Sequence, residues 1–447
     1  MGKKQNVKQL LKAAEKPSKL SRKLHPFYRG KIEVVPKCRV KSMDDFSIWY
    51  SPGVAAVCSD IYKKPELVYE YTNKWNSVAV VSDGTRVLGL GDIGPLAAMP
   101  VMEGKALLYK YLGGVDAYPI CLGSKDESEI IRAVKILQPS FGGINLEDIS
   151  QPKCFPILQT LKNECDIPVW HDDQQGTALV TLAGLINALK VTGKKIGKIK
   201  VAMVGAGAAN ICIARLLMFY GVNPGNIVMT DSKGTLHKGR TDLKDKNPQR
   251  WQLCAQTNAL GVEGYIKEAM ENADAVIALS APGPGIIKPE WIKGMAKNPI
   301  VFACANPVPE IWPWEAKEAG AAVVATGRSD FANQVNNSLG FPGVFRGVLD
   351  ARASKITDNM CITAAAEIAA HIADNKIRPD KILPSMSDWE LFPRVAAAVG
   401  VKAVKEKVAA KKLSYDNFYN AAKDIIKRSR AVTQTMMSKG YIRKVKN

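Results

Sequence analysis

The feature that most constrains the fold of this chain is a glycine-rich turn between a strand-like apolar segment and a helix-forming segment. Residues 198–204 are typical of a buried strand and lead into Gly205-Ala206-Gly207, after which a helix is expected up to Tyr220. A second strand follows at 226–230 and ends at Asp231. This order of elements predicts a βαβ unit whose two strands lie parallel in one sheet.

Such a unit has a physical reason to bind a dinucleotide. Small residues at the turn let a pyrophosphate approach the helix N-terminus, where unpaired backbone N–H groups carry partial positive charge. An acid about 20 residues further along can accept hydrogen bonds from the adenosine ribose hydroxyls. The alternative is that the glycines form only a tight turn, but strand, helix and terminal acid are all in place. The residues expected to contact the dinucleotide are Gly205, Gly207, Ala208, Ala209 and Asp231.

Apolar segments and helix-forming segments alternate along most of the chain. Strands are expected at 115–122, 142–146, 275–279, 300–303 and 322–325. Val78–Val81 and Arg86–Leu88 flank the turn residues Asp83-Gly84, which predicts a hairpin. After Asp350 the chain is typical of helices. We therefore predict an α/β fold, with a Rossmann-type dinucleotide-binding domain, an α/β substrate domain and C-terminal helices.

Four parts are predicted along the chain. They are a basic N-terminal extension at 1–25, a substrate and metal-binding domain at 26–174, a dinucleotide domain at 175–355, and C-terminal helices with a basic tail at 356–447.

Two short acidic runs precede the glycine turn, and each follows an apolar stretch. Glu147 and Asp148 come after one expected strand, and Asp172 and Asp173 come after another at 167–170. Carboxylates delivered to one sheet edge repel each other unless a cation lies between them, and hard oxygen ligands suit Mg²⁺ or Mn²⁺. The alternative is that these acids cap the helices expected near 152–161 and from 176 onward. Finding both runs in one βαβ context favours the metal.

The net charge of +20 lies at the two ends of the chain. Residues 1–41 hold 13 Lys and Arg against two acids, and residues 402–447 hold 13 against three. No aromatic stacking pattern accompanies these lysines, so a solvated surface is preferred over a nucleic-acid or anionic-surface site. Nine cysteines without a C-x-x-C pair indicate free thiols in a reducing compartment. We expect a cytoplasmic protein that does not span a membrane, with residues 1–20 as an organellar leader the alternative.

Several motifs together resemble the malic enzyme family in its short bacterial form, over about residues 26–405. They include Tyr50-Ser51-Pro52-Gly53-Val54-Ala55, Gly104-Lys105-Ala106-Leu107, Asn145-Leu146-Glu147-Asp148, His171-Asp172-Asp173-Gln174-Gln175-Gly176-Thr177, Ala305-Asn306-Pro307 and Gln334-Val335-Asn336-Asn337. The chain departs from the family pattern at Gln175 and Asn210. Neither is a motif acid or base, so these departures bear on cofactor affinity rather than on the reaction.

The resemblance implies oxidative decarboxylation of L-malate to pyruvate and CO₂ with reduction of NAD(P)⁺, and decarboxylation of oxaloacetate as well. It implies Mg²⁺ or Mn²⁺ held by Glu147, Asp148 and Asp173, with Asp172 behind them. Lys105 would be the base that accepts the hydroxyl proton, so its pKa must be lowered, and we expect the cation to lower it. Tyr50 would protonate C3.

The remaining implied roles concern binding. Arg86 would pair with a substrate carboxylate, Asn306 and Asn337 would orient substrate and nicotinamide ribose, and Thr177 would contact the cofactor. The resemblance also implies a homodimer.

The sequence leaves open whether the cofactor is NAD⁺ or NADP⁺ and which reaction of malate is catalysed. Asp231 would repel a 2′-phosphate, which favours NAD⁺, but Ser232, Lys233, Lys238 and Arg240 lie close enough in sequence to favour NADP⁺ instead. Rival reactions are conversion of malate to lactate with a retained NAD, and 2-hydroxy-acid oxidation without decarboxylation. A rival of another class is a polyanion binder that uses the basic ends.

Overall fold

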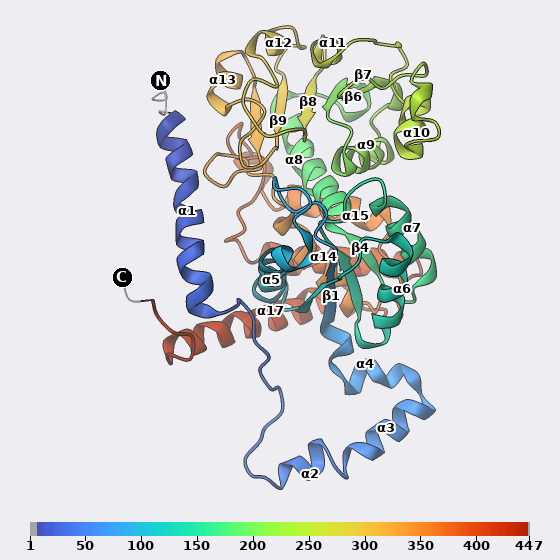
Figure 1. The fold of residues 1–447 in the computed structure, drawn as a ribbon, viewed down its shortest axis with the longest axis vertical. Helices are drawn as coiled ribbons and strands as arrows, with labels where there is room; N and C mark the ends of the chain where they lie inside the picture. Colours follow the sequence, from blue (N-terminus) through green and yellow to red (C-terminus); the bar gives the residue numbers. More distant parts are fainter. Residues whose placement is uncertain (1–6, 446–447) are drawn as a thin grey trace.

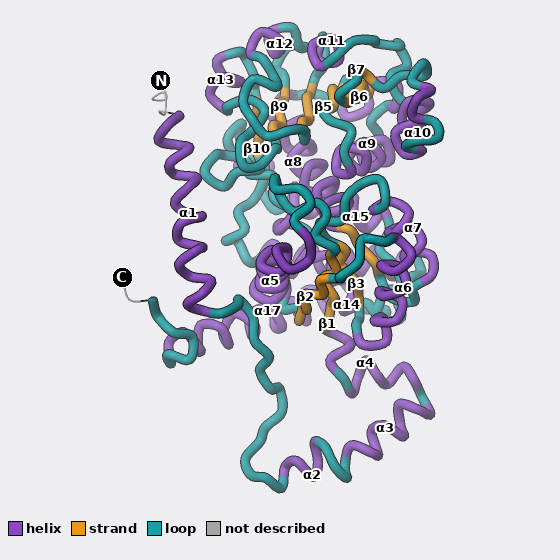
Figure 2. Tube along the Cα trace, viewed as in Figure 1, coloured by secondary structure: helices purple, strands orange, loops and turns teal. Residues whose placement is uncertain are grey.

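The structure, a computed structural model, describes residues 7–445. Two sheets follow each other along its long axis, each with helices packed around it (Figure 1). The first has the strand order β2-β1-β3-β4 and the second β10-β9-β8-β5-β6-β7. All neighbouring strands run parallel except β6 and β7. Figure 2 shows the two groups of strands separated by helices. The α/β fold class is confirmed.

The strands are short and mostly buried. They are β1 (Ser77–Ser82), β2 (Asp116–Cys121), β3 (Gly143–Leu146), β4 (Val169–His171), β5 (Val201–Val204), β6 (Ile227–Asp231), β7 (Gly234–Thr235), β8 (Ala275–Ala278), β9 (Ile300–Ala303) and β10 (Val323–Thr326).

Helices fill the connections between strands and form both ends of the chain. They are α1 (Val7–Tyr28), α2 (Asp45–Trp49), α3 (Val54–Lys63), α4 (Val68–Tyr71), α5 (Gly94–Gly113), α6 (Glu127–Leu137), α7 (Cys154–Glu164), α8 (Thr177–Thr192), α9 (Ala208–Tyr220), α10 (Pro248–Gln256), α11 (Ile266–Met270), α12 (Pro289–Lys293), α13 (Pro313–Glu318), α14 (Phe341–Asp350), α15 (Asp358–Ala370), α16 (Leu391–Lys405) and α17 (Tyr415–Ser438). No helix within residues 7–445 is both long and apolar enough to cross a bilayer.

The sheets lie within the predicted domains at 26–174 and 175–355, although the exact boundaries stay predictions. The predicted extension at 1–25 and the possible leader at 1–20 begin in residues 1–6, outside the described residues; from Val7 onward the chain is α1. The C-terminal helices pack back as expected. Ser429 of α17 donates to the Lys110 carbonyl of α5 at 2.8 Å. α14, which lies inside the predicted dinucleotide domain, also packs on α5: the ring centroids of Phe341 and Phe345 lie 4.6 and 5.3 Å from that of Tyr109.

The predicted hairpin around Asp83-Gly84 is wrong. β1 is a fully buried strand whose partners are the parallel strands β2 and β3, and residues 86–88 form no strand beside it. The turn signal marks instead the loop at the carboxyl end of β1. Asp83 organises that loop by accepting hydrogen bonds from the Thr85 N–H and hydroxyl, at 3.0 and 2.7 Å. A buried parallel strand needs a crossover connection, which a two-residue turn cannot supply.

Residues 38–72, here called the arm, extend from the end of the molecule opposite the second sheet and carry α2, α3 and α4 (Figure 1). No residue of the arm is buried, and several of its large apolar side chains are exposed. The two ends of the arm meet at Asp116, which accepts hydrogen bonds from Lys37 at 3.1 Å and from Asn76 at 2.9 Å. Lys110 of α5 donates to the same carboxylate at 2.6 Å.

We predict that Asp116 makes stability depend on acid. Burial by itself would raise the pKa of Asp116. The hydrogen bond from Lys110 and its positive charge, together with Lys37 and Asn76, outweigh burial and lower this pKa from 3.8 to about 2. A depressed acid pKa stabilises the fold above pH 3.8, and this contribution is lost as the pH falls towards 2. At pH 6, Asp116→Asn should lower the free energy of unfolding by about 2 kcal/mol, and by less at pH 3. Urea unfolding at both pH values measures this.

The matched control for this experiment is Asp374→Asn, because Asp374 is paired with Lys190 but its side chain is 81% exposed. That variant should change the unfolding free energy by less than about 0.5 kcal/mol. Equal effects of the two variants at pH 6 would contradict the assignment.

Candidate active site

A buried lysine lies at the centre of the residues that the sequence singled out. Lys105 projects from α5, and its Nζ lies 2.5 Å from Asp172 Oδ2 and 2.9 Å from Glu147 Oε1. Only 10% of its side chain is exposed, and the ammonium also lies 4.2 Å from the centre of the Phe341 ring. One cation is therefore held by two carboxylates and an aromatic face.

The sheet explains why these acids meet. β3 and β4 are neighbours, with Leu146 paired to His171, so the residues after each strand leave the sheet side by side. Glu147 and Asp172 are the first residues past these strand ends. Since the carboxyl ends of parallel strands share one edge, acids far apart in sequence converge there.

Asp172 is the best-connected member of this group. It is fully buried, and besides Lys105 it accepts hydrogen bonds from Trp170 Nε1 at 3.0 Å and Asn337 Nδ2 at 3.0 Å. Asn337 also bonds to the hydroxyl of Thr177, the first residue of α8. The acid that the sequence placed behind the metal thus links Lys105 to the first helix of the dinucleotide half.

Glu147 is held from its other side by residues to which the sequence gave no role. Asn145 donates to Glu147 Oε2 at 2.7 Å, and the buried Tyr109 hydroxyl donates to Asn145 Oδ1 at 2.9 Å. The signal for Asn145 was a polar residue inside a fully buried strand. Tyr109 gave no such signal, because a tyrosine on a helix facing the core is common.

Asp148 and Asp173 lie beside this group. The Asp148 backbone N–H donates to Asp173 Oδ2 at 2.8 Å, while Asp148 Oδ2 is buried without any hydrogen-bond partner. Asp148 also adopts a left-handed backbone conformation, with φ of 54°, which costs energy for a residue other than glycine. Burial, aided by the negative charge of Asp173, raises the pKa of Asp148 to about 8.

These carboxylates fit a hard divalent cation in their chemistry. They are oxygen donors that repel each other, and Asp148 Oδ2 is buried without a hydrogen-bond partner. As the side chains stand, no group of three or more His, Cys, Asp or Glu residues within 7–445 could hold a metal. Both oxygens of Glu147 are engaged, one with Lys105 and the other with Asn145. The helix-capping alternative is wrong, since neither α7 nor α8 has a side-chain cap.

Two opposing effects act on the pKa of Lys105, and its expected lowering by a bound cation stays a prediction. Burial alone would lower it, but the adjacent charges of Asp172 and Glu147 outweigh burial and raise the pKa of Lys105. The side chain is therefore an ammonium while both carboxylates face it.

The glycine turn has the conformation expected for dinucleotide binding. Gly205 has a φ of 95°, and a Cβ there would lie 2.8 Å from the Leu279 carbonyl oxygen, so only glycine fits. Gly207 ends the turn, and α9 begins at Ala208 and Ala209. Asn210, the departure from the third glycine, is buried and donates to the carbonyls of Val204 and Gly205 at 2.9 and 2.8 Å. It braces the turn.

Glu310 is a further functional candidate that the sequence did not reveal. It is fully buried and accepts hydrogen bonds from the backbone N–H groups of Ser280 and Ala305, at 2.9 and 3.0 Å. It therefore ties the loop after β8 to the loop after β9, which carries Asn306.

The remaining predicted residues are not joined to Lys105 by direct contacts. Arg86 and Asn306 are both exposed. The Arg86 backbone N–H donates to the Asp148 carbonyl at 2.9 Å, and its charge acts on the Asp148 carboxylate. Tyr50 follows α2 on the arm, is 73% exposed and is not brought to Lys105 within this chain. Asp231 ends β6, where both of its oxygens accept hydrogen bonds from Arg240.

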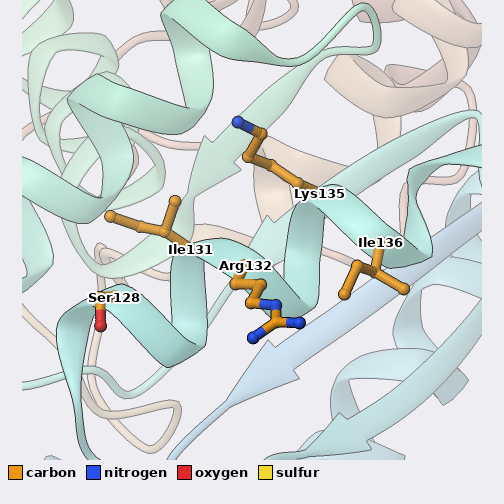
Figure 3. Close-up of a pocket in the computed structure, with 5 residues that line it drawn as sticks. All are labelled: Ser128, Ile131, Arg132, Lys135 and Ile136. Atoms are coloured by element: carbon orange, nitrogen blue, oxygen red, sulfur yellow. The ribbon is translucent and has the colours of Figure 1, made fainter.

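A separate shallow pocket, of about 510 Å³, lies on the outer surface of α6 (Figure 3). Its lining residues are Ser128, Ile131, Arg132, Lys135 and Ile136. All come from one helix and none is a predicted site residue, so the pocket is separate from the chemistry around Lys105.

Comparison with known proteins identifies the family of this chain. Residues 29–129 match the family described as "Malic enzyme, N-terminal domain", and residues 174–408 match "Malic enzyme, NAD binding domain". The chain belongs to the malic enzyme family. Its members among curated proteins include the "NAD-dependent malic enzyme" of Geobacillus stearothermophilus, 52% identical over 86% of this chain and 78% of that one.

Two further relatives of this malic enzyme chain are informative. The "Bifunctional malic/malolactic enzyme" of Bacillus subtilis is 50% identical over 86% of this chain and 93% of that one. The crystal structure of Entamoeba histolytica malic enzyme superposes with a TM-score of 0.95 at 47% identity, covering 100% of this chain and 94% of that one. Other curated relatives carry NADP-dependent names, so the family leaves the choice between NAD⁺ and NADP⁺ open.

We predict that Asp172 supports the fold as well as the site. Asp172→Asn removes one of the two anions beside the buried Lys105 ammonium and should cost about 3 kcal/mol of stability, because a buried charge loses its partner. Thermal or urea unfolding measures this. The matched control is Asp173→Asn, because the Asp173 side chain is 39% exposed. This variant should lower the free energy of unfolding by less than about 1 kcal/mol. Similar losses of unfolding free energy in both variants would show that the Lys105–Asp172 ion pair does not stabilise the fold.

Proposed function

We propose that Lys105, Glu147, Asp148, Asp172 and Asp173 carry out the malic enzyme reaction in this chain, the oxidative decarboxylation of L-malate to pyruvate and CO₂ with NAD(P)⁺. The observation that carries the proposal is the Lys105 ammonium between Asp172 and Glu147, joined through Asn337 to the dinucleotide half. The same centre would also decarboxylate oxaloacetate, because loss of CO₂ from C4 needs only the later half of that reaction.

Glu147, Asp148 and Asp173 would hold Mg²⁺ or Mn²⁺, which supplies Lewis-acid polarisation of the C2 hydroxyl and charge stabilisation during decarboxylation. A cation bound by Glu147 would compete with Lys105 for this carboxylate and would weaken one of the two contacts that keep the lysine protonated. Lys105 can then accept the C2 hydroxyl proton while hydride passes from C2 to the nicotinamide. Asp172 keeps the lysine in position throughout, because it stays bonded to Trp170 and Asn337.

The substrate carboxylate needs a cationic partner, and Arg86 would supply it. Its side chain is exposed beside Asp148, where a bidentate contact to the carboxylate of malate is available. Asn337 and Asn306 would orient the substrate and the nicotinamide ribose, and Thr177 supports Asn337 from α8.

Tyr50 as the acid that protonates C3 requires a second copy of the chain. The arm buries none of its residues, yet it exposes Met43, Ile48, Trp49 and Tyr62 by 51–88%. Short helices with so much exposed apolar surface are not stable alone in water. We propose a homodimer in which each arm packs on the partner subunit and delivers its Tyr50 to the partner's Lys105 centre.

Cofactor identity beyond NAD(P)⁺ depends on Asp231. The sequence argument for NAD⁺ assumed a carboxylate free to accept the ribose hydroxyls, but Arg240 occupies both of its oxygens. Asp231 as it stands therefore gives no reason to prefer NAD⁺ over NADP⁺.

We predict that malate oxidation requires a divalent metal. Malate oxidation should stop in excess chelator and return with Mn²⁺, and Asp173→Asn should weaken Mn²⁺ binding by at least about tenfold because a hard anionic ligand is lost. Direct Mn²⁺ titration by electron paramagnetic resonance measures binding apart from turnover. Asp242→Asn, an acid of the dinucleotide half, is the control and should bind Mn²⁺ normally. Full activity in chelator would overturn the metal assignment.

We also predict that each active site combines Lys105 of one chain with Tyr50 of the other. Lys105→Ala and Tyr50→Phe should each remove most malate turnover as homodimers. Mixing the two variants should restore about a quarter of wild-type activity, because half of the dimers then hold one complete site and one doubly defective site. If Tyr50 acted within its own chain, every site in the mixed dimer would carry one defect and no activity would return.

Product analysis separates the rival reactions. Pyruvate, CO₂ and free reduced cofactor are expected in equal amounts. Lactate without released reduced cofactor would indicate the malolactic reaction, and oxaloacetate without CO₂ would indicate a simple dehydrogenase.

A further inference from the structure

A cluster of charges surrounds Asp231 at the carboxyl end of β6. Its Oδ1 accepts hydrogen bonds from Arg240 Nη1 at 3.0 Å and from the Lys233 backbone N–H at 2.8 Å, and its Oδ2 accepts from Arg240 Nη2 at 3.0 Å. Only 7% of the Asp231 side chain is exposed. The carboxylate is therefore paired and enclosed, so it neither offers free oxygens to ribose hydroxyls nor presents an unbalanced negative charge to a phosphate.

Arg240 is fully used within this cluster. Its Nε and Nη2 also donate to Asp242, at 2.9 and 3.3 Å, so one guanidinium serves two carboxylates. This arrangement makes Arg240 a structural cation, and its donors are not free for a ligand.

Arg250 differs from Arg240 in this respect. It projects from the first turn of α10, and its Nε donates to the Ala206 carbonyl of the glycine turn at 2.9 Å. Its Nη1 lies 3.6 Å from Asp231 Oδ2, beyond hydrogen-bond distance, and in the part of the chain that the structure describes neither Nη atom donates a hydrogen bond. The Arg250 side chain is only 21% exposed, and its one ion pair, with Asp231, is shared with Arg240 and involves no hydrogen bond.

The position of Arg250 matters as much as its free donors. Its guanidinium reaches from the glycine turn to the end of β6, the two places between which the adenosine ribose lies in a dinucleotide-binding βαβ unit. Lys233 adds a further positive charge, with its Nζ 3.5 Å from Asp242. The cluster thus holds three cations and two carboxylates, an excess of positive charge that suits a phosphate better than a neutral hydroxyl.

We propose that Arg250 binds the 2′-phosphate of the adenosine ribose and makes this chain prefer NADP⁺ to NAD⁺. Asp231 and Arg240 form the rigid floor of this subsite, and Arg250 supplies the free, fork-shaped donors. The inference rests on the proposed function in taking the adenine dinucleotide as the cofactor of malate oxidation. It replaces the sequence prediction of NAD⁺, which required an unoccupied Asp231.

The test measures binding without turnover. Calorimetry would compare adenosine 2′,5′-bisphosphate with AMP on the full-length wild type and on Arg250→Gln. The wild type should bind the bisphosphate at least about tenfold more tightly, because charge-assisted hydrogen bonds to the 2′-phosphate are strong. Arg250→Gln should weaken bisphosphate binding by about ten- to a hundredfold and leave AMP binding within about twofold. Arg250→Lys, which keeps the charge but loses the fork, should fall between them.

The matched control is Arg215→Gln. Arg215 is an exposed arginine of α9 whose Nη2 bonds to Gln252 of α10, at 3.1 Å, so it lies near the same helix without touching the glycine turn. Its loss should change neither affinity. In turnover assays, kcat/KM for NADP⁺ should fall in Arg250→Gln while that for NAD⁺ is retained.

Two results would overturn the inference. One is a wild type that binds AMP as tightly as the bisphosphate, and the other is an equal loss of both ligands in Arg250→Gln, which would mean that Arg250 only supports the turn. Discrimination in binding together with no malate turnover would refute the proposed function and leave this subsite standing. Malate turnover with NAD⁺ preferred, unchanged in Arg250→Gln, would refute the subsite alone.

Discussion

The contact on which the site depends is the buried ion pair between the Lys105 ammonium and the carboxylates of Asp172 and Glu147. Two desolvated anions and one desolvated cation are costly to bury, so each must be fixed by further hydrogen bonds. Trp170 and Asn337 hold Asp172, and Asn145 holds Glu147. The pair also connects the two halves of the molecule, since Asn337 bonds to Thr177 at the start of α8. A rearrangement of this cluster would therefore change contacts in both halves of the molecule.

The cluster is held in a state suited to receiving a cation. Asp148 has a strained backbone, a raised pKa and an oxygen without a partner, all beside Asp173. A strained backbone and an unpaired buried oxygen persist only where the surrounding fold enforces them, here at the carboxyl ends of β3 and β4. Lys105 supplies positive charge to this cluster by pairing with Glu147. Competition between an ammonium and a divalent cation for the same carboxylate would couple metal binding to the protonation state of the base.

Within a single chain the arm is left uncovered. The arm carries a predicted catalytic residue away from the site and exposes apolar side chains that the body of the same chain does not cover. Its ends are anchored together on Asp116, so the arm leaves and re-enters the body at one point. Such a loop can exchange between two copies of a chain without altering the fold of either body.

The sequence by itself determined the α/β class, the strands other than β7, and the acids at the ends of β3, β4 and β6, because hydrophobic period, glycine turns and polar residues after apolar strands are local signals. It did not reveal the short helices α10 to α13 between the later strands. The same local character explains the error at Asp83-Gly84, where a turn signal cannot tell a hairpin from a loop that follows a parallel strand. Only the tertiary structure decided that Asp231 is already paired with Arg240, that the Nη donors of Arg250 beside it make no hydrogen bond, and that Tyr50 is not brought to Lys105. These facts depend on which side chains converge from distant segments, and the energy of a charged contact is set by partners and burial that no local pattern encodes.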